Sequence, residues 1–552
     1  MMRVKLLSSL EKCFMDENVV NKRALTEKIS FLKNEIYSFQ ICYDRDEIVD
    51  AKVIVGLKLD SPLADAIRVY KVKSIPSQLP VYRNRYDDDY LRTTPGLYPD
   101  LLEPIRENDR LTVDNTLQSL WFEIDPAGKY EAGVYPITCT FVTPAGEVDG
   151  EVKLEVEIIN ALLPDQKLIF TQWFYTDCLL QYYGTEAFDE KHWQIIENFM
   201  TNARRYGMNM ILTPILTPEL DTYVGGERPT TQLLKVFKDG DKYTFDFSQV
   251  GRWVDLCRKV GIEYLEINHM FSQWGAAACP KVIATVDGEE KRIFGWDTEA
   301  DGDDYKAFLS AMIPALIDYL KNEKDGADKM CWFHLSDEPN EKHLEQYKKL
   351  SAFLKPLIKG YPMLDALSRY EFYEQGLVDH PVPCNNHLDP FLANNVPELW
   401  TYYCCSQSKE VSNRFFSMPS YRNRIIGVQM YKYDIFGFLQ WGYNFYNNQY
   451  SYATINPFLC SDGECFAPSG DAYSVYPGTN GQPWPSLRQL VFHDALQDMR
   501  ALKLCEELYG KEKVLEVMEA GIDPITFKKY PRSADYILAL RRKINELIQE
   551  KV

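Results

Sequence analysis

The chain has 552 residues, of which 45% are hydrophobic, and its formal net charge is −19. This composition is typical of a globular protein with a sizeable core, and the acidic balance argues against nucleic acid or anionic membrane as partners, because both bind clustered lysine and arginine. The sequence shows no apolar stretch long enough for a signal peptide or a membrane-spanning helix, and its 13 cysteines are odd in number. We therefore expect a cytoplasmic protein with free thiols that acts on a neutral or small substrate.

The first 160 residues are mainly of β type. Residues 36–42, 120–124 and 152–158 alternate apolar with polar side chains, which predicts strands buried on one face. These segments predict an N-terminal β-sandwich over residues 1–163. Residues 82–104 contain three consecutive Asp residues and several Pro and Gly, so we expect a long loop there.

After residue 165 short apolar runs alternate with helical stretches. The candidate strands are 167–170, 208–212, 264–267, 330–335, 363–367, 381–384, 399–403 and 435–441. Apolar residues at three- and four-residue spacing predict helices over 191–206, 247–260, 304–321 and 342–359. About eight βα units predict a (β/α)8 TIM-like barrel over residues 164–505, with its active site at the carboxyl ends of the strands. Residues 506–552 are expected to form a helical extension packed on the barrel.

Two adjacent carboxylates follow the fourth of these apolar runs, in the sequence Ser336-Asp337-Glu338-Pro339. Buried carboxylates forced together have their pKa values pushed apart, so one can stay protonated near neutral pH, as a glycosidase acid must. Pro339 favours an extended or turn conformation at Glu338, which could place both carboxyls on one rim. The alternative is a helix N-terminus, where Asp and Glu satisfy free amides and the helix dipole.

The spacing of the pair bears on the reaction. Ordinary glycosidases need two carboxyls flanking the scissile bond, and sequence neighbours flank it poorly. One possibility is a protein nucleophile from another strand, Glu266 or Asp365. The other is a substrate that supplies its own nucleophile: the 2-acetamido oxygen attacks the anomeric carbon, Asp337 orients the amide, and Glu338 protonates the leaving oxygen.

Further candidate residues lie where the predicted strands end. The candidates for sugar binding are Trp173, His269, Trp274, Tyr402, Trp441 and Asn444. Aromatic rings and an amide suit a pyranose ring, but plain packing is the alternative for each of them, and His269 is equally consistent with a hydrogen-bonded structural histidine. By strand alternation His334 should point away from Asp337 into the core, and Asp471 is expected to form a turn.

The order of several short motifs resembles glycoside hydrolase family 123 and its relatives grouped as domain of unknown function 4091. The motifs are Thr94–Asp100, Ala132–Tyr135, Trp173-Phe174, His192-Trp193, Ser336–Pro339, Tyr476-Pro477-Gly478, Pro485–Arg488 and Asp494–Asp498, which span nearly the whole chain. The resemblance implies a β-sandwich, a (β/α)8 barrel and β-N-acetylgalactosaminidase activity by substrate-assisted retention. It also implies that Asp337 positions the amide and that Glu338 is the acid/base.

The sequence thus predicts a retaining exo-glycosidase that removes a terminal β-linked N-acetylgalactosamine or related 2-acetamido sugar. Its expected partner is a carbohydrate, with no cofactor and no metal, because no cluster of His and carboxylates at ligand spacing is visible. Two alternatives stay open: a glycosidase of non-acetamido substrates with a protein nucleophile, and an inactive carbohydrate-binding protein. The sequence leaves the aglycone and the oligomeric state open.

Overall fold

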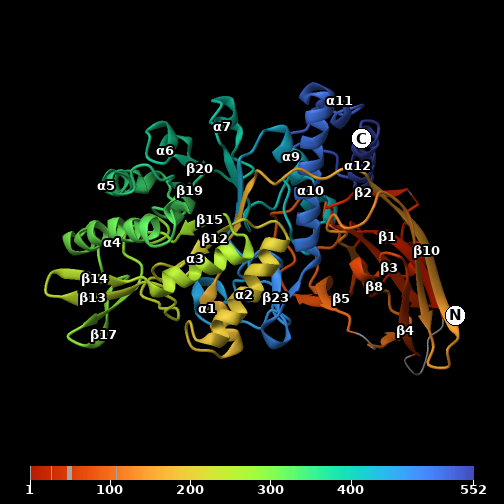
Figure 1. Cartoon of the computed structure of the whole chain (residues 1–552), viewed down its shortest axis with the longest axis horizontal. Helices are drawn as coiled ribbons and strands as arrows, with labels where there is room; N and C mark the ends of the chain where they lie inside the picture. Colours follow the sequence, from red (N-terminus) through yellow and green to blue (C-terminus); the bar gives the residue numbers. More distant parts are fainter. Residues whose placement is uncertain (1, 27, 47–52, 107–108) are drawn as a thin grey trace.

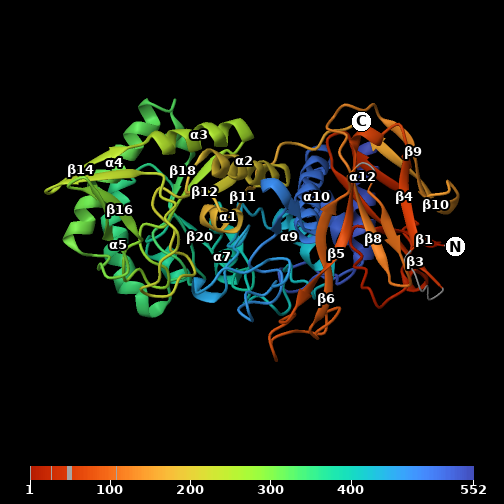
Figure 2. The same cartoon turned by 90° about the horizontal axis from the view of Figure 1, so that it is seen from below.

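The computed structural model describes residues 2–26, 28–46, 53–106 and 109–552. Figure 1 shows the N-terminal strands at one end of the molecule, a mixed α/β region at the other, and helix α10 (Leu487–Tyr509) between them. The view in Figure 2, turned by 90°, gives the same arrangement. The architecture therefore joins a β part to an α/β part.

Two five-stranded sheets make up the N-terminal part and share one hydrophobic core. The first has the order β1 (Met2–Ser8), β3 (Tyr37–Arg45), β8 (Gln118–Ile124), β5 (Ile67–Ser77), β6 (Gly96–Pro104); the second has the order β2 (Ile29–Leu32), β10 (Val148–Ile159), β9 (Gly133–Val142), β4 (Val53–Asp60), β7 (Leu111–Val113). In β10 the buried residues Val152, Leu154 and Val156 alternate with exposed Lys153 and Glu155, which is the period that the sequence predicted.

Strand β6 occupies the end of the segment that was expected to be a loop, so that prediction was wrong over Gly96–Pro104. The strand pairs antiparallel with β5 along its length. Pro and Gly argue against a strand in isolation, but long-range pairing on a sheet edge outweighs that local preference.

The α/β region contains a strand within or overlapping each predicted segment. A six-stranded parallel sheet has the order β18 (Cys331–Phe333), β15 (Tyr264–Ile267), β12 (Met210–Thr213), β11 (Ile169–Gln172), β22 (Gly437–Gln440), β21 (Trp400–Tyr402). Strands β19 (Leu364–Ala366) and β20 (His380–Val382) form a parallel pair. Parallel bridges from Phe333 to Met363 and from Cys384 to Tyr402 connect this pair to the two edges of the sheet.

Helices follow most of these strands: α1 (Thr176–Tyr183), α2 (Glu190–Arg205), α3 (Ser248–Val260), α4 (Asp303–Asn322), α5 (Leu344–Leu357), α6 (Tyr370–Glu374), α7 (Asp389–Ala393), α8 (Ser420–Arg424) and α9 (Ile426–Lys432). The Asp189 side chain accepts a hydrogen bond from the His192 amide and caps α2. The buried residues Trp193, Ile196 and Met200 then recur on one helical face.

Four further strands form a sheet that the sequence reading missed. Its order is β14 (Lys242–Asp246), β13 (Lys235–Asp239), β16 (Val282–Val286), β17 (Glu289–Phe294), and its two hairpins are inserted after β12 and β15. The second hairpin turns at Asp287-Gly288, both with positive φ. An Asp-Gly pair between alternating segments is a hairpin signal, so this element was readable from the sequence. A short hairpin of β23 (Val475–Pro477) and β24 (Pro483–Pro485) precedes α10.

The C-terminal helices α10 and α12 (Ala534–Gln549) contact both parts of the molecule, and α11 (Lys511–Met518) packs on these two helices. The Arg488 guanidinium of α10 binds Asp100 of β6 at 2.7 Å, and Arg541 of α12 binds Glu35 at 2.6 Å. Both ion pairs are buried. The tail contains helices as predicted, and its last helix, α12, packs on β2 of the second N-terminal sheet as well as on α8.

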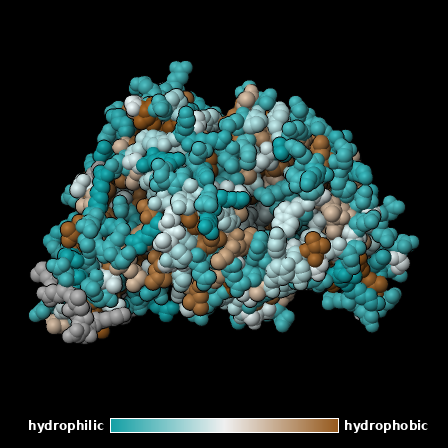
Figure 3. Space-filling view, turned by 180° about the vertical axis from the view of Figure 1, so that it is seen from behind, coloured by the Kyte–Doolittle hydropathy of each residue, from teal (hydrophilic) through white to brown (hydrophobic). Residues whose placement is uncertain are grey.

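The surface is mostly polar. On the face drawn in Figure 3, hydrophobic residues are scattered among hydrophilic ones, as is ordinary for a folded protein. Within the described ranges, no helix has the length and apolar character needed to cross a membrane.

Candidate active site

The acidic pair lies in a bend just after β18, at the carboxyl end of the parallel sheet. Glu338 has φ of +44°, which a side chain other than Gly seldom adopts, and its amide donates to the Ala366 carbonyl at 3.0 Å. The Asp337 carbonyl accepts from the Trp274 amide at 2.9 Å. Of the extended and turn conformations expected for Glu338, the turn is present. The backbone hydrogen bonds to Ala366 and Trp274 hold it in place.

Asp337 is a buried carboxylate with spare hydrogen-bonding capacity. It is 7% exposed, and its Oδ1 has no hydrogen-bond partner among the described residues. Burial raises the pKa of Asp337 well above its ordinary value, and the neighbouring Glu338 charge raises it further, while His334 opposes the shift. An unsatisfied buried carboxylate is costly to keep, which is typical of a functional position.

Glu338 is exposed and has one strong partner. The Tyr402 hydroxyl, from the end of β21, donates to its Oε1 at 2.5 Å. Burial raises the pKa of Tyr402 well above its ordinary value, so the phenol stays protonated and acts as the donor. The predicted site residue Tyr402 therefore orients Glu338 directly.

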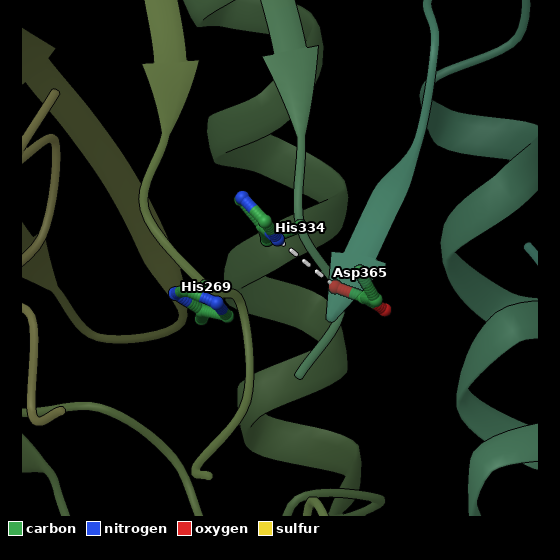
Figure 4. Close-up of side chains that lie close together, drawn as sticks. All are labelled: His269, His334 and Asp365. Atoms are coloured by element: carbon green, nitrogen blue, oxygen red, sulfur yellow. Dashed lines mark hydrogen bonds and ion pairs between the residues drawn. The ribbon is translucent and has the colours of Figure 1, made fainter. Parts of the chain in front are cut away.

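Two further carboxylates, Glu266 of β15 and Asp365 of β19, are fully buried and share His334. The His334 ring donates from Nε2 to Glu266 at 2.7 Å and from Nδ1 to Asp365 at 3.1 Å. Figure 4 shows the His334 and Asp365 side chains joined at the ends of β18 and β19. Burial lowers the pKa of His334, but the two carboxylates outweigh it and raise the value to about 9. His334 is thus an imidazolium at neutral pH.

The His334 side chain is buried in the core, as the sequence predicted. Strand β18 ends at Phe333, one residue before His334. The His334 charge lowers the pKa of Asp337, so the two groups interact electrostatically.

Glu266 and Asp365 have no spare oxygen for attack on a sugar. Glu266 accepts from Trp173 Nε1 at 2.8 Å and from Thr171 as well as from His334. Asp365 accepts from Tyr347 and from the Leu335 amide in addition to His334. Both carboxyls are 0% exposed. These contacts argue against either residue as a protein nucleophile.

His269 lies beside this group with both ring nitrogens buried and unpartnered within the described part of the chain. Its ring stacks on His334 with centroids 4.2 Å apart and meets Trp173 edge-on at 5.2 Å. Ligand atoms of His269, His334 and Asp365 lie within 4.8 Å of one another, so these three could approach a metal ion (Figure 4). Both nitrogens of His334 are already bonded to carboxylates, and a metal would have to displace one of them.

The predicted binding residue Trp441 is hydrogen-bonded to a further carboxylate, Asp471. The Trp441 Nε1 donates to Asp471 Oδ2 at 2.8 Å, which fixes the orientation of the half-buried indole. Burial raises the pKa of Asp471 to about 6. Asp471 ends a turn, as expected, because its amide donates to the Pro468 carbonyl at 3.2 Å. Its buried carboxyl also accepts hydrogen bonds from Trp441 and Gln440.

Two predicted binding residues have structural contacts instead. Asn444 is 0% exposed, and its amide bonds the backbone of Tyr175 at both ends, at 2.8 and 2.9 Å. Trp173 is buried, and its Nε1 is used by Glu266. Asn444 is therefore a packing residue, and Trp173 holds the Glu266 carboxylate in place. Trp274, by contrast, is 40% exposed beside the acidic pair.

Asp221 was missed by the sequence reading. It lies in the loop after β12, accepts from the Tyr450 amide at 3.3 Å, and its charge raises the pKa of Asp337. Burial raises the pKa of Asp221 itself to about 7. The sequence signal that could have identified Asp221 was an acidic residue in the loop that follows a predicted parallel strand.

A cavity with a volume of about 1600 Å³ lies elsewhere, and Arg68, Arg205 and Trp484 are among the residues that line it. None of the acidic residues discussed above lines it. Geometry and unsatisfied charge, and not cavity size, identify the candidate active site.

Comparison with known proteins identifies relatives. Residues 173–505 match the family model described as glycoside hydrolase 123, catalytic domain. A family 123 glycoside hydrolase from Clostridium perfringens, solved to study glycolipid glycan hydrolysis, has a TM-score of 0.75 at 13% identity, over 100% of this chain and 98% of that one. This likeness shows a shared fold.

More distant structures match weakly. A family 2 glycosyl hydrolase from Bacteroides cellulosilyticus has a TM-score of 0.26 at 11% identity, over 78% of this chain and 45% of its own. Parabacteroides merdae β-glucuronidase has a TM-score of 0.29 at 11% identity, over 91% and 51%. Such scores carry no argument. No curated protein matches the sequence.

Proposed function

Because this chain belongs to the glycoside hydrolase 123 family, we propose that it is a retaining exo-glycosidase that removes a terminal β-linked 2-acetamido sugar by substrate-assisted catalysis. The observation that carries the proposal is the pairing of a buried carboxylate with a free oxygen, Asp337, and an exposed carboxyl, Glu338. N-acetylgalactosamine is the sugar implied by the family resemblance. The Clostridium perfringens relative acts on glycolipid glycans, which makes such glycans a candidate source of the substrate.

Asp337 is proposed to act on the acetamido group. Its unpartnered Oδ1 accepts the amide N–H, which orients the acetamido oxygen and increases its negative charge as that oxygen bonds to the anomeric carbon. Burial and the Glu338 charge raise the pKa of Asp337, and the His334 imidazolium opposes that shift in favour of the ionised form that this step needs. The role also explains why a carboxylate is kept in so costly a position.

Glu338 is proposed as the acid and then the base. It gives its proton to the glycosidic oxygen as the bond from the anomeric carbon to that oxygen breaks. The resulting carboxylate takes a proton from water, which attacks the anomeric carbon and releases the acetamido oxygen. Two inversions give net retention. The hydrogen bond from Tyr402 holds Glu338 in one orientation through both steps.

The sugar ring is proposed to lie among Trp441, His269 and Trp274. The fixed indole of Trp441 offers an apolar face, and the free nitrogens of His269 can bond hydroxyls. The saturated contacts of Glu266 and Asp365 support the acetamido mechanism over a protein nucleophile.

For the architecture we infer a β-sandwich over residues 1–163, a closed (β/α)8 barrel over 164–505 and a helical extension over 506–552. The parallel bridges at both edges of the β19–β20 pair support closure, since they connect all eight strands in one ring. In such a barrel the active site lies at the carboxyl ends of the strands, where the acidic pair is found.

The test is release of 4-nitrophenol from β-glycosides of N-acetylgalactosamine, N-acetylglucosamine, galactose and glucose. Turnover confined to the acetamido sugars, with inhibition by a thiazoline mimic of the cyclised intermediate, is expected. Glu338→Gln should lower turnover of an unactivated disaccharide by about 10²–10⁴-fold but affect the 4-nitrophenyl glycoside less, because that leaving group needs little protonation.

Asp337→Asn should impair acetamido substrates specifically. Turnover of the plain hexosides would contradict the proposal and place the nucleophile on the protein. A folded wild-type protein that binds the acetamido sugars without turning any of them over would favour the inactive, carbohydrate-binding alternative.

A further inference from the structure

The cavity of about 1600 Å³ is lined by residues from both parts of the molecule, and we call it the junction cavity. Within the described ranges, five cations and two carboxylates line it: Lys58, Arg68, Arg106, Arg110 and Arg205 against Asp65 and Asp109. Over the whole chain the balance is the opposite, with 61 Lys and Arg against 80 Asp and Glu. The junction cavity is therefore a basic site on an acidic protein.

Two of these cations, Lys58 of β4 and Arg68 of β5, are exposed. Neither side chain has an ion pair in the part of the chain that the structure describes. Arg205 differs, because it lies 2.5 Å from Glu123 and 2.8 Å from Asp125. Arg205 thus belongs to the framework, and Lys58 and Arg68 are available to a ligand.

One of the two lining carboxylates is already paired. Asp109 lies 3.5 Å from Lys71, which does not line the junction cavity. The Arg106 guanidinium donates to the Thr479 hydroxyl at 3.3 Å, and this neutral partner leaves its charge in place. The charge that the junction cavity offers to a ligand is therefore positive.

The junction cavity also has side chains suited to sugar rings. Trp484 of β24 is half-buried, and a side chain added at Gly478 would lie 2.5 Å from its indole, so close packing fixes the ring. Exposed Thr201 and Gln482 add a hydroxyl and an amide. A fixed apolar ring and neutral polar groups in one cavity match the apolar faces and the hydroxyls of a sugar.

We propose that the junction cavity binds an acidic oligosaccharide, with Lys58 and Arg68 at its carboxylate or sulfate groups and Trp484 against a sugar ring. Pockets of roughly 300–1000 Å³ already hold a drug-sized molecule, so this cavity has room for several sugars. None of the proposed catalytic residues lines it, so it is a second site, separate from cleavage. The choice of a carbohydrate rests on the proposed function, whereas the choice of an anion rests on the charges.

The test compares an α-linked tetragalacturonide with its fully methyl-esterified form, which has the same sugars without the charges. By calorimetry the wild type should bind the acid about tenfold more tightly than the ester, and added salt should weaken binding of the acid. Neither ligand has a 2-acetamido group, so the measurement does not depend on the proposed active site.

Lys58→Glu and Arg68→Glu should each weaken binding of the acid about tenfold, because each replaces attraction by repulsion. Lys153→Glu is the matched control, since it makes the same charge change at an exposed strand residue that does not line the junction cavity. Trp484→Ala should also weaken binding about tenfold, and Trp484→Phe, which keeps a ring, should weaken it less. Turnover of the 4-nitrophenyl glycoside should be unchanged in all of these variants.

Equal affinity for acid and ester, or equal losses in Arg68→Glu and Lys153→Glu, would overturn the proposal. Competitive inhibition of glycoside turnover by the tetragalacturonide would also overturn it and place the ligand in the active site. Inorganic sulfate or a tetraglutamate peptide bound as tightly as the tetragalacturonide would assign the cavity to a simple anion or an acidic peptide instead. If the wild type turns over no acetamido sugar, the proposed function fails, but tetragalacturonide binding that Arg68→Glu weakens would still uphold the second site.

Discussion

Two sets of acidic side chains meet at the carboxyl ends of the parallel strands, and they differ in how their oxygens are used. Glu266 and Asp365 are fully buried, share the His334 imidazolium, and have bonded partners for their oxygens. Asp337 has a buried oxygen without a described partner, and Glu338 is exposed. Glu266 and Asp365 therefore form a satisfied set that belongs to the framework, whereas Asp337 and Glu338 form an unsatisfied set, the one that we propose binds substrate.

Removal of the His334 imidazolium, which Glu266 and Asp365 share, should have the largest effect on stability. His334→Ala leaves Glu266 and Asp365 without their shared partner, and breaking such a buried pair costs about 3–5 kcal/mol of unfolding free energy. Chemical denaturation monitored by circular dichroism measures the loss. His493→Ala is the control, because His493 is also buried but burial lowers its pKa to about 3 and keeps it neutral. Equal losses for the two variants would show that the His334 charge is unimportant.

The same cation should make stability depend on pH. The pKa of His334 is raised from 6.5 in the unfolded chain to about 9 in the folded one. Its contribution is therefore fully present below pH 6.5 and is lost as pH rises through about 9, on the order of 3 kcal/mol. Denaturation at several pH values should show this loss in the wild type and not in His334→Ala. A parallel pH dependence in both proteins would assign the effect to other groups.

Removal of the Asp337 charge, in the unsatisfied set, should stabilise the protein. Burial raises the folded pKa of Asp337 above 3.8, so ionisation costs stability as pH rises above 3.8 and the cost is complete above the raised value. Asp337→Asn should therefore gain about 1–2 kcal/mol at pH 7 to 8 while it loses activity on acetamido sugars. Glu338→Gln, at an exposed position, should leave stability unchanged. Destabilisation by Asp337→Asn would instead support the capping role considered from the sequence.

The smallest expected effect concerns the orientation of Glu338. Tyr402→Phe removes the hydrogen bond to Glu338 Oε1 and should lower kcat/KM about tenfold with little change in stability. Tyr403→Phe is the matched control, since the Tyr403 hydroxyl is buried without a hydrogen-bond partner in the described ranges. Steady-state kinetics on an unactivated disaccharide distinguishes the two, and similar activities would mean that Glu338 needs no such support.

Much of the fold was readable because periodicity reports burial. Period-two alternation identified β10, and the apolar runs identified the parallel strands, including the one that ends beside Asp337. The inserted hairpins were missed, although Asp287-Gly288 signalled one of them. Strand β6 was misread because its pairing with β5 is a long-range contact.

The candidate site was only partly readable. The sequence selected Asp337, Glu338 and Tyr402, which the structure places together, and it also selected Asn444, which is a packing residue. It missed Asp221, because the paths of loops after strand ends decide which side chains converge. Residue types indicated carboxylate chemistry, but they did not indicate which carboxylate oxygens would have hydrogen-bond partners in the folded protein.

The sequence by itself determined the alternating pattern of the strands, the adjacent carboxylates and the family of the chain, since these depend on residue identity and local spacing. Only the tertiary structure decided that Glu266 and Asp365 share one imidazolium and that Asp337 keeps a free oxygen. The physical reason is that burial and hydrogen bonding between segments far apart in the chain set the charge and availability of each group.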